Sequence, residues 1–375
     1  ISGTNIIGYG AIEINGVPQP DGRRVMSFFR DEAIVGGFIL SFGLIISGFI
    51  MSNFDRAYSN TVWLGIYKIV GLILVSLLIL TVPYENANAD KNGIIKIPKH
   101  DWSSQLVGAE VVGELMKMVG EKIEYVPINS KIVYQSMADG DIDIVHNAFG
   151  ASYTKALGSG GIEEILIHDA VSREDWWYPW YVERACPGLP DWKALGKCSA
   201  KFARADSDGK GVFIGGPVDW LKHDAEKIEA LGMNFIVKNV DSAGAIWAEL
   251  DAAVKQKKPI VIFNWSPNFI GAKYAGKFVN FPKYDPQCET NASWGINPNA
   301  LYDCGNPANE HLKLAVNSDF KKNHPKAYKV IKKINFSSSD VDKMANYVDT
   351  DGLEVSHAAE QWFKDHKKKW SKWVK

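Results

Sequence analysis

The sequence predicts an α/β protein with two lobes hinged like a clamshell, followed by a helical C-terminal segment. Two stretches, 94–149 and 211–265, each alternate between strand-like and helical patterns. Such alternation is typical of parallel α/β units, and here it occurs twice. The chain of 375 residues is longer than one ordinary domain and has room for two lobes.

The first unit begins with an apolar segment at 94–100, which predicts a strand. A one-sided apolar pattern at 103–119 then predicts a helix, with its apolar face formed by Leu106, Val107, Val111, Val112, Leu115 and Met118. The rest of the unit is predicted as a strand at 123–128, a short helix through Tyr134 and Met137, and a strand at 141–149.

The second unit repeats this order, and beyond residue 310 the pattern is almost wholly helical. Its elements are predicted as strands at 211–217, 235–240 and 259–265, with helices at 219–231 and 242–256. We expect lobe 1 to contain 90–180 and about 270–375, and lobe 2 about 181–269. In such folds a ligand lies between the lobes, at the carboxyl ends of strands.

Two apolar runs near the N-terminus, 34–51 and 62–82, approach the length that spans a membrane. The second ends at Ala87-Asn88-Ala89, the small-x-small pattern of a signal peptidase site. We therefore expect a signal peptide within 51–89, cleavage before Asp90 and a periplasmic location. Residues 1–50 are expected to lie upstream of a native start at Met51. The alternative is that the apolar segments are retained and anchor the protein to the membrane.

All four cysteines lie in the exported part, an even number that suits an oxidising compartment. Four cysteines allow three pairings, and free buried thiols are the alternative. We favour Cys186–Cys198 and Cys288–Cys304, because each pair closes a short loop rich in Pro, Gly and Asp. There is no C-x-x-C motif, so neither zinc binding nor redox catalysis is indicated.

The composition excludes several classes of function. With 42 Lys+Arg against 43 Asp+Glu, the chain lacks the positive field that nucleic-acid binding requires. The motifs of serine hydrolases, zinc proteases, P-loop proteins and dinucleotide-binding proteins are absent from the sequence. The eight histidines show no metal-binding spacing. A binding protein without a metal is therefore expected rather than an enzyme.

Tryptophan is the prominent residue type, because 12 of the 13 tryptophans follow residue 100. Four of them fall where strands end or lobes should face each other: Trp102, Trp176, Trp220 and Trp265. Indole faces attract a cation that has no hydrogen to donate. The four therefore predict a cage for a methylated ammonium group. Backbone N–H groups near Trp176 and at Ser103 and Ser104, where a helix starts, could hold an anionic end of the ligand.

Several segments resemble one family. They are Trp102 after a strand, QSMADGDIDI at 135–144, the W-x-x-P-x-Y-V motif at 176–182, Trp265-Ser266-Pro267, and the tail from HPKAYKVIKKINF to QWFKDHKKKWSKW. Over nearly all of 90–375 the chain is similar to periplasmic substrate-binding proteins of glycine betaine, proline betaine and trimethylamine N-oxide ABC importers. The resemblance implies the two-lobed periplasmic-binding fold, no cofactor, and delivery to an ABC permease in the inner membrane with a cytoplasmic ATPase.

The resemblance also implies site residues. By motif position the cage consists of Trp102, Trp176, Trp220 and Trp265, with Trp177, Trp180 and Tyr181 close by. Glycine betaine is the expected ligand of a monomeric protein, and trimethylamine N-oxide, choline and dimethylsulfoniopropionate are alternatives.

Two positions depart from the family patterns. A histidine of some betaine binders is replaced by Leu106, and an acid expected in trimethylamine N-oxide binders is replaced by Trp180. A different class, an exported carbohydrate-binding module or an enzyme using the same cleft, is disfavoured. Around Trp176 only Arg173, Glu174 and Asp175 could serve as polar partners for a sugar.

Overall fold

The computed structural model describes residues 13–14, 17–18 and 93–375. The first two pairs form short antiparallel strands, β1 (Glu13–Ile14) and β2 (Val17–Pro18), in a unit separate from 86–375. The apolar runs and the predicted signal peptide at 51–89 lie outside the described residues. In the part of the chain that the structure describes, no helix has the length and hydrophobicity needed to cross a membrane.

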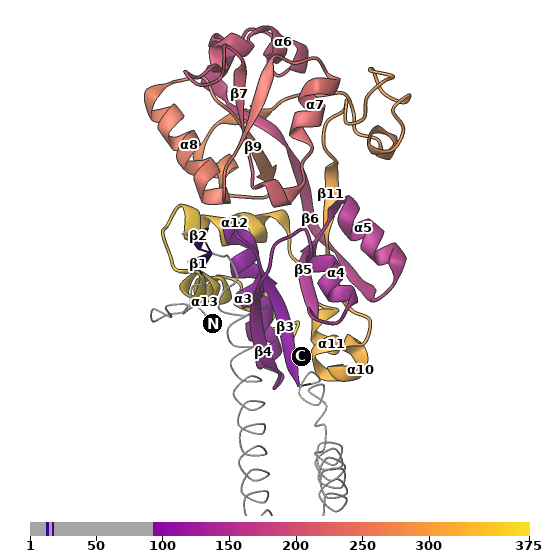
Figure 1. The fold of residues 1–375 in the computed structure, drawn as a ribbon. Helices are drawn as coiled ribbons and strands as arrows, with labels where there is room; N and C mark the ends of the chain where they lie inside the picture. Colours follow the sequence, from indigo (N-terminus) through magenta and orange to yellow (C-terminus); the bar gives the residue numbers. More distant parts are fainter. Residues whose placement is uncertain (1–12, 15–16, 19–92) are drawn as a thin grey trace, which may run out of the picture. The chain divides into compact units, whose positions relative to one another are not determined.

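Lobe 1 is built on a parallel strand pair, β3 (Ile94–Lys99) and β4 (Lys122–Pro127), with helix α3 (Ser103–Lys117) packed on it. The C-terminal helices also belong to this lobe, and two of them, at Ser338–Asp349 and Val355–Asp365, pack against α3 (Figure 1). The other elements of lobe 1 are α4 (Val133–Ala138), β5 (Ile144–Ala148), α5 (Gly150–Ser159), α10 (Phe320–Asn323), α11 (Pro325–Ile331), α12 (Ser338–Asp349), α13 (Val355–Asp365) and α14 (Lys367–Trp370).

Lobe 2 contains a parallel arrangement in which β7 (Gly211–Gly215) lies between β8 (Phe235–Asn239) and β9 (Val261–Ser266). Helices α7 (Asp224–Ala230) and α8 (Ala243–Gln256) connect these strands. The remaining elements are η1 (Trp180–Arg184), α6 (Trp192–Lys197), η2 (Ser199–Phe202), η3 (Val218–Trp220), α9 (Ile270–Lys273), β10 (Gly276–Phe278) and η4 (Pro286–Glu289).

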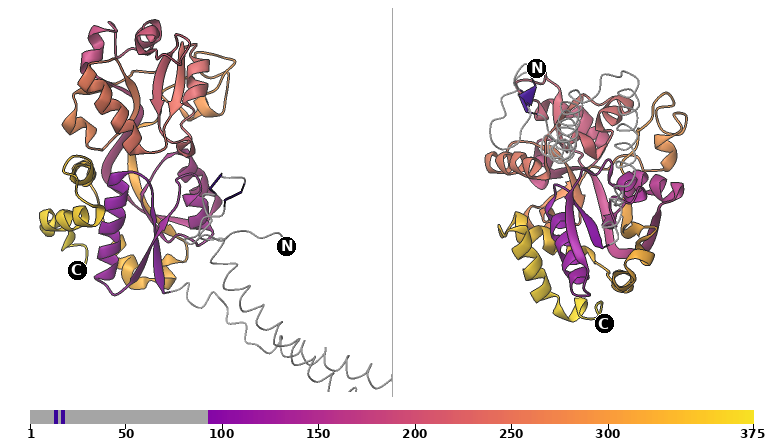
Figure 2. Two further views of the ribbon diagram at one scale, coloured as in Figure 1. Left: turned by 60° about the vertical axis from the view of Figure 1, so that its left-hand side comes forward. Right: turned by 60° about the horizontal axis from the view of Figure 1, so that its bottom comes forward.

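Two long antiparallel strands connect the lobes, β6 (Ile162–Pro179) and β11 (Ala308–Asn317) (Figures 1 and 2). The first part of β6 pairs with β11, whereas its last part pairs with β9 and β10 of lobe 2. The resulting mixed sheet has the order β5-β11-β6-β9-β7-β8. Since both lobes share these strands, bending them is the simplest way to open and close the cleft.

Two large hydrophobic cores correspond to the two lobes. The first includes Ile95 and Trp362, and the second includes Phe213 and Ile262. Ile270 and Val279 pack in the second core. The segment from about 270 to 279, which the sequence assigned to lobe 1, therefore lies with lobe 2, because the chain returns to lobe 1 only through β11.

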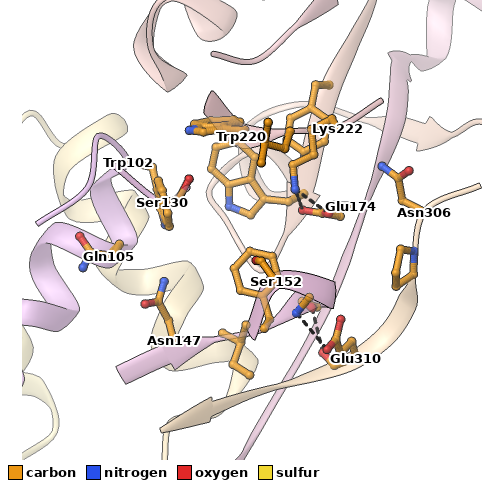
Figure 3. A pocket seen from close by; sticks show the side chains of 18 of the residues that line it. Trp102, Gln105, Ser130, Asn147, Ser152, Glu174, Trp220, Lys222, Asn306 and Glu310 are labelled. Carbon is orange, nitrogen blue, oxygen red and sulfur yellow. Dashed lines mark hydrogen bonds and ion pairs between the residues drawn. The ribbon is translucent and has the colours of Figure 1, made fainter. Parts of the chain in front are cut away.

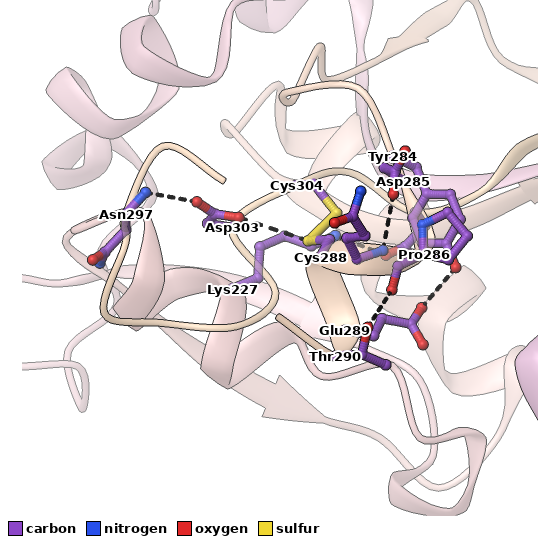
Figure 4. Close-up of a disulfide and its surroundings, with 12 residues drawn as sticks. Lys227, Tyr284, Asp285, Pro286, Cys288, Glu289, Thr290, Asn297, Asp303 and Cys304 are labelled. Atoms are coloured by element: carbon purple, nitrogen blue, oxygen red, sulfur yellow. Dashed lines mark hydrogen bonds between the residues drawn. A yellow bond between two sulfur atoms is a disulfide. The ribbon is translucent and has the colours of Figure 1, made fainter. Parts of the chain in front are cut away.

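Both predicted disulfides are confirmed: Cys186 pairs with Cys198, and Cys288 pairs with Cys304. The second closes a loop in which Asp303 accepts a hydrogen bond from the backbone N–H of Asn297, 2.7 Å away (Figure 4). Cys304 also lies in the wall of the cleft described below. This disulfide therefore constrains a segment that borders the candidate site.

The predicted alternation of strands and helices is confirmed in both units, but β5 pairs with the antiparallel strand β11 and not with β3 or β4. The helix expected at 219–231 is split into η3 and α7, because Leu221 and His223 between them adopt left-handed backbone angles. Beyond residue 310 the chain continues as strand β11 to Asn317 before it becomes helical. Strand β6 was not predicted from the sequence.

Candidate ligand-binding site

A cavity of about 310 Å³ is lined by residues from both lobes and from the connecting strands. This volume is at the small end of the range for ligand pockets and suits a small molecule. Figure 3 shows side chains from several elements pointing into the same space. The principal lining side chains are His100, Trp102, Ser104, Tyr134, Asn147, Phe149, Glu174, Trp220, Lys222, Phe263, Trp265, Asn306 and Glu310.

Three of the predicted tryptophans meet at this cavity. Trp102 is the N-cap residue of α3, three residues after the end of β3, whereas Trp220 ends η3 and Trp265 lies in β9. The Trp220 ring is edge-on to both others, 5.9 Å from Trp102 at 82° and 5.5 Å from Trp265 at 84° between ring planes. The indoles therefore form a corner contributed by both lobes.

Local features of the chain position this corner. Gly216 is required beneath Trp220, because a Cβ atom there would collide with the indole ring. On β9, Phe263 and Trp265 are two residues apart, which places them on the same side of the strand. The Phe263 ring centroid lies 5.7 Å from that of Trp220 and extends the aromatic wall.

Trp176 is not part of the cavity wall. Its side chain is fully buried in the core of lobe 2, stacked on Phe213 with ring centroids 3.9 Å apart. Its indole N–H donates a hydrogen bond of 2.7 Å to Asp224 Oδ1. Phe235 and Phe281 make edge contacts with the same ring, each 5.6 Å away between centroids. Trp176 therefore has a structural environment rather than a ligand-facing one.

The other predicted residues also lie away from the cavity lining. Trp177 is buried against Gly276, while Trp180 is half exposed and lies 5.5 Å from the Arg184 guanidinium. The Tyr181 hydroxyl donates to the carbonyl of Lys258. Ser103 donates to Asp349 on α12, whereas the neighbouring Ser104 does line the cavity. The structure therefore brings together Trp102, Trp220 and Trp265 of the predicted set.

Several lining residues were not predicted from the sequence. Glu174 and Lys222 form an ion pair with an N–O distance of 2.6 Å, and both are largely buried. Asn306 Nδ2 is buried without a hydrogen-bond partner among the described residues, while Asn306 Oδ1 accepts from Lys227 Nζ at 2.9 Å. Lys222 could have been proposed as a site residue from the sequence, because it follows Trp220 by two residues. In the described ranges no three His, Cys, Asp or Glu side chains are grouped to hold a metal ion.

Three buried histidines lie on the lobe 1 side of the cavity. The ring of His100 stacks on Trp102, with centroids 4.8 Å apart. Burial lowers the pKa of His146 to about 3, with smaller contributions from His168 and His100. Burial likewise lowers the pKa of His168 to about 4, partly offset by a hydrogen bond to the carbonyl of His146. Both rings are therefore neutral at physiological pH.

Because of these two histidines, we expect the folded protein to be less stable at acid pH. The unfolded chain takes up these protons near pH 6.5, but the folded chain does so only near pH 3 to 4. The free energy of unfolding should therefore fall as the pH drops below 6.5, by about 2 kcal/mol per histidine at pH 5. Urea unfolding at pH 7.5 and 5 measures this loss.

The variant His146→Leu should lose less stability between the two pH values than the unmodified protein. His357→Gln, which removes an exposed histidine of α13, is the matched control. An identical pH dependence in His146→Leu and the unmodified protein would contradict the assignment.

Comparison with known proteins identifies the family. Residues 93–365 match the family described as the substrate binding domain of ABC-type glycine betaine transport systems. The chain belongs to this family. Its members are substrate-binding domains of transporters and not enzymes, and the resemblance noted in the sequence is confirmed.

Individual relatives show how similar the chain is to other members of the family. It is 40% identical over 324 residues to the trimethylamine N-oxide-binding protein of Pelagibacter ubique, covering 82% of this chain and 99% of that one. Among solved structures, it is similar to the lactococcal glycine betaine complex (TM-score 0.58, 20% identity, 75% and 99% coverage). It is also similar to the glycine/betaine/L-proline-binding protein of Borrelia burgdorferi (TM-score 0.60, 17% identity, 75% and 97% coverage). These structures confirm the two-lobed fold.

Proposed function

We propose that this protein captures a small methylated ammonium osmolyte in the cavity between its lobes and delivers it to an ABC permease. The observation that supports this most strongly is the corner of three indoles, Trp102, Trp220 and Trp265, contributed by both lobes. A ligand held there would contact both lobes at once and so favour the closed form.

The chemistry of the wall suits such a ligand. A fully methylated nitrogen carries positive charge but has no N–H to donate, so it gains little from carboxylates alone. Each indole face contributes about 0.5–1 kcal/mol to binding a cation when exposed and about 2 kcal/mol or more when desolvated. Three desolvated faces contribute about 6 kcal/mol. Micromolar affinity corresponds to about −8 kcal/mol after the costs of association, so it also requires contacts between the ligand and other groups of the cavity.

Trimethylamine N-oxide is the first ligand candidate. The support is the relative from Pelagibacter ubique, which aligns over almost its whole length at 40% identity and whose name states that ligand. Glycine betaine, the ligand expected from the sequence, is the second candidate. Both molecules combine a methylated cationic nitrogen with an oxyanion, so the same cavity could accept either.

We place the protein outside the cytoplasm, in the periplasm, as a monomer that meets an inner-membrane permease with a cytoplasmic ATPase. The family to which the chain belongs supports this role. The two disulfides agree with it, because such bonds persist in oxidising compartments. Retention of the N-terminal apolar segments would make the same protein membrane-anchored without changing its chemistry.

Calorimetric titration of the purified protein tests the proposal. The ligands are trimethylamine N-oxide, glycine betaine, choline, dimethylsulfoniopropionate and a hexose. We expect micromolar or tighter binding of at least one methylated onium compound and none of the hexose. If the folded protein binds none of the onium compounds, the proposed function is contradicted. Binding of the hexose would favour a carbohydrate-binding module.

A further inference from the structure

Lys222 places a fixed positive charge in the wall of the cavity. Its Nζ donates to both carboxylate oxygens of Glu174, at 2.6 and 2.7 Å (Figure 3). The exposed fractions of the two side chains are 18% and 19%. Glu174 lies on β6 and pairs in register with Trp265 on β9. The ion pair is therefore built into the sheet beside the indole corner and is partly shielded from solvent.

The ammonium group of Lys222 also lies against aromatic rings of the cavity. It is 5.2 Å from the ring centroid of Phe263 and 5.7 Å from that of Phe149. Phe263 in turn contacts Trp220, so a single phenyl ring separates this charge from the indole corner. An ammonium group has three N–H donors, and among the described residues only Glu174 accepts from this one. At least one donor is therefore available to a ligand.

The backbone around Lys222 is held in an unusual conformation. Leu221 and His223, on either side, both have positive φ angles, 51° and 53°. Such angles are unfavourable for residues other than glycine, and in functional regions they often position a particular side chain. Here the two left-handed residues interrupt the path from η3 to α7, and the side chain between them lies in the cavity lining.

We propose that Lys222 determines ligand specificity by binding the anionic oxygen of a zwitterionic methylated ammonium compound. This inference rests on the proposed function. The indole corner would hold the methylated nitrogen, and the free N–H of Lys222 would donate to the N-oxide or carboxylate oxygen. Such charge-assisted hydrogen bonds are strong in a shielded site. A purely cationic ligand such as choline offers no anion, and it would be repelled by the lysine charge.

The test compares inner salts with simple cations across a set of variants. Lys222→Met removes the charge and keeps most of the side-chain length, whereas Lys222→Arg keeps the charge. Lys238→Met is the matched control, because Lys238 also forms a salt bridge in lobe 2, but with Glu249 on the surface. Each variant is titrated by calorimetry with trimethylamine N-oxide, glycine betaine, choline and tetramethylammonium. Lys222→Gln replaces the methionine variant if the latter does not fold.

Lys222→Met should weaken binding of the inner salts by about tenfold to a hundredfold, as expected for a lost charge-assisted hydrogen bond. Its affinity for choline and tetramethylammonium should be unchanged or higher, so the selectivity ratio falls. Lys222→Arg should retain most of the selectivity, and Lys238→Met should behave as the unmodified protein does.

Two outcomes would overturn the inference. In the first, the unmodified protein binds inner salts, but Lys222→Met weakens binding of all four ligands by the same factor or leaves binding of all four unchanged. Lys222 would then only support the cavity wall, and the proposed function would stand. If the unmodified protein binds none of the four ligands, the proposed function fails and this inference fails with it.

Discussion

Replacing Trp220 with alanine should weaken binding of a methylated ammonium ligand by about thirtyfold or more, the equivalent of one desolvated indole face. Trp220 lies between Trp102 and Trp265 and is edge-on to both. Removing it therefore deletes one face and leaves the other two without the ring that separates them. Calorimetric titration of the variant with trimethylamine N-oxide and glycine betaine measures the loss.

Trp180→Ala is the matched control for this experiment. Trp180 is half exposed and lies outside the cavity lining, although its sequence position had placed it near the cage. Its replacement should leave ligand affinity unchanged. If Trp180→Ala weakened binding as much as Trp220→Ala did, the cavity described here would not be the binding site.

Replacing Trp176 with alanine should lower the free energy of unfolding by about 3–5 kcal/mol, a typical loss for a buried tryptophan. The substitution leaves a cavity beside Phe213 and removes the donor to Asp224, whose carboxylate is buried. Urea unfolding at pH 7.5 measures the change. Ligand affinity of the folded variant should stay within about threefold of that of the unmodified protein, because the changed contacts lie within the core of lobe 2.

The opposite pattern is informative. A variant at Trp176 with normal stability and strongly reduced ligand affinity would show that this residue does contact the ligand. It would restore the four-tryptophan cage expected from motif position and would contradict the placement of Trp176 in the core.

The local α/β units could be predicted because their signals are local. Strand β3 and helix α3 follow from apolar periodicity within one stretch of chain. Strand β6 could not be predicted in this way. Its paired residues in β9 and β11 lie about 85 to 155 positions away, and charged residues interrupt its apolar alternation. What stabilises this strand is long-range pairing, which a single sequence does not display.

The candidate site likewise contains some residues whose place could be predicted from the sequence and others whose place could not. Trp102 and Trp220 follow strand ends closely, so their place at the cleft could be anticipated from strand order. Trp176 is also a tryptophan in a motif that resembles the family, but it packs against Phe213 in the core of lobe 2. Lys222 lies in the cavity lining between two residues with left-handed backbone angles. The residue types Leu and His do not signal these angles, so its spacing of two residues after Trp220 was the available clue.

A crystal structure of the protein with trimethylamine N-oxide or glycine betaine bound tests the central claim most directly. The account predicts methyl groups in van der Waals contact, about 3.5–4 Å, with the rings of Trp102, Trp220 and Trp265. It also predicts the ligand oxygen within hydrogen-bond distance of Lys222 Nζ. A ligand bound outside this cavity, or one whose methyl groups avoid the three indoles, would contradict the account.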